Sequence, residues 1–139
     1  MNIREKDLYP TIRNTGPFAK KQFYYEIPIG DWATSRKRID LVILKNQKLI
    51  SIEVKISNWK KALQQAYANL YVFDYSYVAL WYKTIPNVDT DIFKTLGIGI
   101  LEVNGSCQEI VKAKKSKLVI PRCKNYAKNK CKSKEGIQN

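Results

Sequence analysis

The sequence contains no histidine among its 139 residues, and this absence removes a large group of catalytic mechanisms. Ser-His-Asp triads, Cys-His pairs and metal sites built on imidazole all depend on that side chain. Any catalysis by this chain must therefore use carboxylates, lysines and hard metal ions.

Cysteine is also scarce, and the three that occur are Cys107, Cys123 and Cys131. An odd number argues against a disulfide framework, and the lack of both C-x-x-C spacing and histidine argues against a zinc site. We expect all three to be free thiols.

Long hydrophobic runs are absent as well. The longest apolar stretches have the length of a strand, whereas roughly 20 apolar residues are needed to span a bilayer. No charged and then apolar signal peptide opens the chain. We therefore expect a cytoplasmic protein without membrane association, in which 45% hydrophobic residues suffice for one core.

Acidic side chains are few compared with basic ones, 12 against 25, which gives a net charge of +13. Residues 1–111 hold 15 basic and 11 acidic side chains, while residues 112–139 hold 10 basic ones and only Glu135. A surface this basic attracts polyanions, and nucleic acid is the most economical partner. The alternative is a lysine-rich surface that reflects biased codon usage.

This charge distribution predicts two parts. Residues 1–111 form the folded body, and residues 112–139 form a basic C-terminal segment. From Asn125 onward almost nothing apolar is available for packing, so we expect the last part to be mobile and to act as an electrostatic arm.

Hydrophobic periodicity predicts an α/β domain with a mixed sheet, because strand-like and helix-like patterns alternate along the body. Asn104-Gly105 is typical of a hairpin turn, Ser57 is a candidate helix cap, and Gly97 a helix end. Helices are expected at residues 3–13, 59–74 and 90–96, and strands at 22–29, 38–44, 49–57, 77–82, 97–103 and 108–113.

Two of these strands carry the candidate chemistry. A period of two places Asp40, Val42 and Leu44 on one face of the first. The same period places Leu49, Ser51, Glu53 and Lys55 on one face of the second. If a short turn makes Leu44 face Leu49, the paired residue numbers add up to 93, and Asp40 then lies across from Glu53.

Two facing carboxylates repel one another unless a cation lies between them. Mg²⁺ prefers oxygen ligands and commonly takes one or two carboxylates, with waters and substrate phosphate completing its shell. Lys55, two residues beyond Glu53 on the same face, could contact a water or phosphate oxygen there. The alternative is that Asp40, Glu53 and Lys55 are ordinary charges on a solvated hairpin.

This pattern also resembles a known family. Asp40, a gap of twelve residues and then Glu53-Val54-Lys55 resemble the signature of the PD-(D/E)XK nucleases. The resemblance covers about residues 3–103, and it departs at Ile39, where the family name has proline. It implies a restriction-endonuclease-like core, with a central mixed β-sheet flanked by helices.

The resemblance also implies roles for individual residues. Asp40, Glu53 and the backbone carbonyl of Val54 would bind Mg²⁺, for which Mn²⁺ would substitute. Lys55 would orient or deprotonate the attacking water.

The flanking helices supply further candidates by the same resemblance. An acidic residue of the first helix would join the site, for which Glu5 is the first choice and Asp7 the second. A polar residue of the second helix would also reach it, with Gln65 favoured over Gln64.

The loop before the Asp40 strand has the composition of a DNA contact. Arg36, Lys37 and Arg38 are basic, and Trp32 can lie against a sugar or base. Lys60, at the start of the second helix, is a further candidate for DNA contact.

The sequence therefore predicts a Mg²⁺-dependent endodeoxyribonuclease that cleaves DNA by attack of a metal-activated water, and that acts as a homodimer or on a structured substrate. Two alternatives stay open. One is a resolvase specific for Holliday junctions or another DNA structure, and the other is a non-catalytic nucleic-acid-binding module of the same fold.

Overall fold

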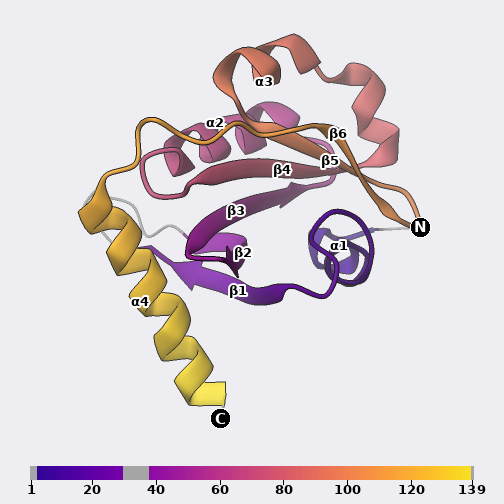
Figure 1. Cartoon of the computed structure of the whole chain (residues 1–139). Coiled ribbons are helices and arrows are strands. Elements are labelled where there is room, and N and C mark those ends of the chain that lie inside the picture. Colours follow the sequence, from indigo (N-terminus) through magenta and orange to yellow (C-terminus); the bar gives the residue numbers. More distant parts are fainter. Residues whose placement is uncertain (1–2, 30–37, 139) are drawn as a thin grey trace.

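The protein is described by a computed structural model, which covers residues 3–29 and 38–138. Six strands form one sheet in the order β1-β2-β3-β4-β5-β6, with helices packed against it (Figure 1). The strands are β1 (Gln22–Pro28), β2 (Arg38–Lys45), β3 (Lys48–Lys55), β4 (Tyr75–Trp81), β5 (Gly99–Val103) and β6 (Cys107–Val111). The helices are η1 (Glu5–Leu8), α1 (Tyr9–Asn14), α2 (Trp59–Asn69), η2 (Tyr82–Asn87), α3 (Thr90–Leu96) and α4 (Pro121–Gln138).

The sheet is mixed. Strands β1, β2 and β3 pair antiparallel, β4 is parallel to both β3 and β5, and β6 returns antiparallel to β5. The α2 helix connects β3 to β4, as a parallel pair requires a crossover. The expected α/β class with a central mixed sheet is therefore confirmed.

The register predicted for the β2–β3 hairpin is confirmed as far as Leu41 and Ile52, and the predicted pair of Asp40 and Glu53 lies just beyond this ladder. Leu44 faces Leu49 and Val42 faces Ser51, so the paired residue numbers add up to 93. The turn between the strands is formed by Asn46 and Gln47, whose φ angles of 51° and 67° are both positive. Two residues with positive φ match the twist of a tight hairpin and fix its register.

Beyond this pairing, β2 and β3 separate. The paired residues run from Lys45 and Lys48 to Leu41 and Ile52, although β2 begins at Arg38 and β3 continues to Lys55. The alternation of β2 also changes here, since Ile39 packs in the same cluster as Val42 rather than with Leu41, as a regular strand would require. The regular alternation of β2 is therefore interrupted at Asp40.

The core lies on both faces of the sheet. On one face, Leu8, Ile12 and Phe18 of the N-terminal segment pack on residues of β2 to β5 such as Ile52 and Leu101. On the other face, α4 covers the β1–β3 side and α2 with α3 covers the β4–β6 side.

One of the predicted helix-end signals is confirmed and two are wrong. Gly97 ends α3 in the left-handed conformation with φ of 76°, as expected. The α2 cap is Asn58, whose side chain accepts a hydrogen bond from the Lys61 N–H at 3.1 Å, and not Ser57. The helix also ends earlier than expected, at Asn69.

The expectation of a mobile C-terminal arm with little to pack is corrected by the structure. Residues 121–138 form α4, which lies beside β1 (Figure 1). Ala127 and Cys131 are fully buried, and the Lys124 ammonium lies 3.0 Å from the buried Asp74 carboxylate. Cys123, Ala127 and Cys131 recur every four residues, so small side chains make an apolar stripe that the abundant lysines obscure.

We predict that Ala127→Glu will lower the melting temperature and that Asn129→Glu will not. The first change places a carboxylate in the core, which costs roughly 2 kcal/mol or more, whereas Asn129 is exposed on the same helix. Thermal unfolding followed by circular dichroism makes the comparison. Equal melting temperatures for the two variants would contradict the docking of α4.

Candidate functional site

Asp40 lies where β2 and β3 separate, and its side chain replaces a backbone partner. One Asp40 carboxylate oxygen, Oδ2, accepts a hydrogen bond from the Val54 N–H at 2.8 Å. That N–H points toward β2, where the ladder ends at Ile52. The aspartate therefore supplies the hydrogen-bond acceptor that the Val54 N–H would otherwise lack, and the same bond holds the Asp40 side chain in place.

Glu53 is almost fully buried, with 1% of its surface exposed. Its Oε2 accepts a hydrogen bond from the Asn69 side-chain amide of α2 at 2.8 Å. The Asp40 and Glu53 carboxyl groups are also close enough to share a hydrogen bond. Two carboxyl groups in this position require either a shared proton or a cation.

The electrostatics of Asp40 reflect this crowding. Burial raises the pKa of its carboxyl group above the usual value. The Val54 N–H, the Lys55 ammonium and a hydrogen bond with Glu53 lower the pKa, while the negative charge of Glu5 adds to its rise. The ionised form is thus disfavoured by its surroundings, and a bound cation would relieve that penalty.

Lys55 is held by an acidic residue of the N-terminal segment. Its Nζ lies 3.6 Å from Oε2 of Glu5, and its side chain is 18% exposed. The other acidic candidate, Asp7, instead accepts a hydrogen bond from the Arg4 N–H at 2.8 Å and pairs with the Arg4 guanidinium. The structure therefore brings Glu5, rather than Asp7, to the predicted site.

The donors around Asp40 and Glu53 fit a magnesium ion. In a β-strand the N–H and C=O of one residue point to the same side, so the Val54 carbonyl faces the gap in which its N–H meets Asp40. Two carboxylates and one carbonyl are the hard oxygen ligands that Mg²⁺ takes together with waters and phosphate. Among the described residues, no three His, Cys, Asp or Glu side chains cluster as metal ligands.

A polar residue of the second helix reaches the site. Asn69 contacts Glu53, and Gln65, the predicted residue, is half-buried one turn earlier on the same side of α2. Sequence reasoning missed Asn69, because an asparagine at a helix end is usually a sign of termination. Its spacing of four from Gln65 is the signal that could have found it.

Tyr9 and Glu26 also lie near the site and were not predicted from the sequence. The Tyr9 ring stacks on Tyr25, with centroids 5.9 Å apart, and Glu26 pairs with the Lys6 ammonium at 3.1 Å. Burial raises the pKa of the Tyr9 phenol, and the negative charges of Asp40 and Glu26 raise it further. Tyr9 therefore stays protonated and can donate a hydrogen bond at this edge.

The predicted DNA-contact residues are placed only in part. Arg38 is exposed, with its guanidinium 3.8 Å from the Glu26 carboxylate, and Lys60 is exposed with its Nζ 5.8 Å from the Trp59 ring centroid. Trp32, Arg36 and Lys37 lie outside the described residues. Across the described part of the chain, no helix has the length and apolar character needed to cross a bilayer.

Comparison with known proteins places the fold beside one solved structure. No family model matches this chain, and no curated protein matches it. The structure is similar to that of the SPO1766 protein of unknown function from Silicibacter pomeroyi, with a TM-score of 0.70 and 14% sequence identity over 99% of this chain and 90% of that one. At this identity the likeness shows a shared fold and nothing of the activity.

We predict that Asp40→Asn will stabilise the protein at pH 7 in the presence of EDTA. A carboxyl group with a raised folded pKa stabilises the fold below its unfolded value of 3.8, and this contribution is lost as the pH rises through the folded value. The variant should therefore melt above the wild type at pH 7, and the difference should shrink as the pH falls toward 4.

The control for this comparison is Asp91→Asn, at an exposed position on α3. Its melting temperature should follow that of the wild type across the same pH range. A constant difference between Asp40→Asn and the wild type at all pH values would show that Asp40 is not electrostatically disfavoured.

Proposed function

We propose that this protein is a Mg²⁺-dependent endonuclease that hydrolyses phosphodiester bonds in DNA. The observation that carries the proposal is the meeting of Asp40, Glu53 and Lys55 at the point where β2 and β3 separate. Two partly desolvated carboxylates beside a lysine form a site for a hard cation and a phosphate. The chain's net charge of +13 supports a polyanionic substrate.

The metal would be held by the Asp40 and Glu53 carboxylates and by the Val54 carbonyl. When bound, it supplies Lewis-acid polarisation of the scissile phosphate and lowers the pKa of a water. Asn69 acts on this set indirectly, since its hydrogen bond to Glu53 Oε2 at 2.8 Å fixes the rotamer of that ligand.

Lys55 is the residue placed to contact the reacting groups. Its ammonium, held 3.6 Å from Glu5, can donate hydrogen bonds to an attacking water or to a phosphate oxygen as negative charge develops. Glu5 positions this ammonium before the substrate enters. The Glu5 carboxylate can also accept a proton from the attacking water while Lys55 orients that water.

The edge of the sheet around the site is suited to a nucleic-acid backbone. Because β3 and β4 are parallel, with Lys55 beside Leu80, their C-terminal ends lie at the same edge. The Lys83 Nζ lies 5.1 Å from the Trp81 ring centroid there, and Lys60 extends over Trp59 at the start of α2. Ammonium groups alongside aromatic rings provide phosphate contacts and surfaces against which sugars and bases can lie.

We predict that Asp40→Ala, Glu53→Ala and Lys55→Ala will each reduce DNA cleavage about 100-fold or more and leave most DNA affinity intact. These residues stabilise the transition state, whereas affinity comes from many phosphate contacts. Cleavage is measured on linear, nicked, flap and four-way DNA with Mg²⁺, Mn²⁺ or EDTA. Affinity is measured by fluorescence anisotropy on the same substrates.

Matched controls are Asp91→Ala and Lys94→Ala, which remove one charge of each sign at exposed positions of α3. Both should cleave like the wild type. Cleavage near the wild-type rate by any of the three site variants would exclude the proposed site. Tight DNA binding by the wild type without cleavage of any substrate would instead favour the non-catalytic binding module.

A further inference from the structure

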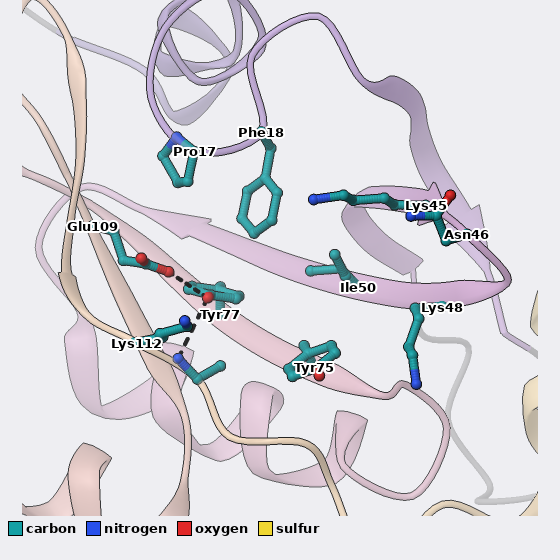
Figure 2. A pocket seen from close by; sticks show the side chains of 11 residues that line it. Pro17, Phe18, Lys45, Asn46, Lys48, Ile50, Tyr75, Tyr77, Glu109 and Lys112 are labelled. Carbon is teal, nitrogen blue, oxygen red and sulfur yellow. Dashed lines mark hydrogen bonds between the residues drawn. The ribbon is translucent and has the colours of Figure 1, made fainter.

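A second feature of the molecule is a pocket of about 360 Å³ at the opposite end of β3 from the candidate site. Its floor is formed by Ile50 of β3 and by Tyr75 and Tyr77 of β4, and Phe18, in the segment after α1, forms a wall (Figure 2). Ile50 and Tyr75 are direct neighbours in the parallel register. The pocket is thus an aromatic surface set into a rigid sheet.

The aromatic rings are fixed in place by packing. Phe18 and Tyr77 make an edge-to-face contact with centroids 5.2 Å apart. Gly99, opposite Tyr77 on β5, leaves room for the tyrosine ring, because a Cβ at this position would lie 2.3 Å from Tyr77 Cε2. The pocket walls are therefore preformed, which lowers the entropy lost on binding a flat ligand.

The acidic group of the pocket is already engaged. The Tyr77 hydroxyl donates a hydrogen bond to Glu109 at 2.5 Å, and accepts one from the Ala113 N–H at 3.4 Å (Figure 2). These two hydrogen bonds hold the Tyr77 hydroxyl from both sides.

Three basic side chains line the pocket. Lys45 and Lys48 flank its mouth from the β2–β3 turn, and Lys112 approaches from the segment after β6 (Figure 2). A hydrogen bond with Lys115, together with the like charge of that side chain, lowers the pKa of Lys48. Ammonium groups around one pocket can each contact a phosphate.

We propose that this pocket binds an unpaired base of single-stranded DNA, with the base against Tyr75 and the flanking phosphates on Lys45, Lys48 and Lys112. An aromatic surface edged by lysines is the arrangement that binds single strands without sequence preference, since every base has a flat face. This inference rests on the proposed function and makes it more specific, because it gives DNA with a single-stranded segment as the substrate class.

The pocket and the candidate site are separated by a covered stretch of β3. Ile50 and Lys55 are five residues apart, which corresponds to about 17 Å along the strand. Ile52 and Val54, between them, are fully buried beneath the N-terminal segment, and Glu53 is hydrogen-bonded to Asn69 of α2 on the other face of the sheet. A single strand that engages both would have to pass around the N-terminal segment, so it must be longer than the roughly five nucleotides that span 17 Å.

The test is the binding of a fluorescein-labelled ten-nucleotide thymidine strand in EDTA, measured by anisotropy for the full chain. Tyr75→Leu removes the ring but keeps an apolar side chain, and it should raise the Kd at least about fivefold. Tyr75→Phe keeps the ring and should bind like the wild type. Melting temperatures of both variants exclude unfolding as the cause of any loss.

The lysines are tested through the salt dependence of the same binding. Lys45→Gln with Lys48→Gln should reduce the magnitude of the slope of log K against log salt by about 0.7 per lysine. Lys94→Gln with Lys132→Gln removes the same charge from exposed helical positions away from the pocket and should leave the slope unchanged. Equal effects of the two pairs, or wild-type binding by Tyr75→Leu, would overturn the proposal.

Failure of the pocket and failure of the proposed function give different results. If Tyr75 matters for binding while the wild type cleaves no DNA, the pocket stands and the nuclease proposal fails. If Asp40→Ala abolishes cleavage while Tyr75→Leu binds the strand like the wild type, the nuclease proposal stands and the pocket fails.

Discussion

The Asp40 and Glu53 carboxyl groups meet at a point where the backbone pairing of β2 and β3 has stopped, and much of the surrounding structure exists to hold them there. Asp40 takes the Val54 N–H that β2 no longer pairs, and Asn69 holds Glu53 from α2. Glu53 is buried and Asp40 half-buried, and two neighbouring carboxylates in such surroundings are unfavourable unless a proton or a cation is shared. The fold therefore maintains a local electrostatic penalty, as is common where a protein binds a charged ligand.

Much of this arrangement follows from sequence because it depends on short-range rules. The period of two predicts the faces of β3 and of β2 from Leu41 onward, and the two-residue turn at Asn46 and Gln47 sets their register. Together these rules predict that Asp40 and Glu53 lie close to one another, without any knowledge of the tertiary structure.

Other features depend on contacts between distant segments, and the sequence pattern does not show them. The contact of Asn69 with Glu53 depends on how far α2 extends over the sheet, and that of Glu5 with Lys55 depends on the path of η1. The stripe of Cys123, Ala127 and Cys131 is too small and too rich in neighbouring lysines to stand out as a core face. Side-chain size and tertiary packing, rather than secondary-structure propensity, determine which contacts these residues make.

The two ends of β3 offer complementary chemistry. At one end, carboxylates beside Lys55 suit a cation and a reacting phosphate, and at the other, aromatic rings with lysines suit an unpaired base and its neighbouring phosphates. A rigid strand connects them, so the separation between bound base and cleaved bond would be fixed by the fold.

The central claim is that Asp40 and Glu53 share a metal ion. The most direct measurement is the anomalous X-ray scattering of a crystal soaked in Mn²⁺, with an Asp40→Asn crystal soaked in the same way as the control. The account predicts one Mn²⁺ peak between the two carboxylates and within coordination distance of the Val54 carbonyl, and a lost or weakened peak in the variant. Wild-type crystals with Mn²⁺ bound only elsewhere, and with Asp40 and Glu53 still in direct contact through a shared proton, would contradict it.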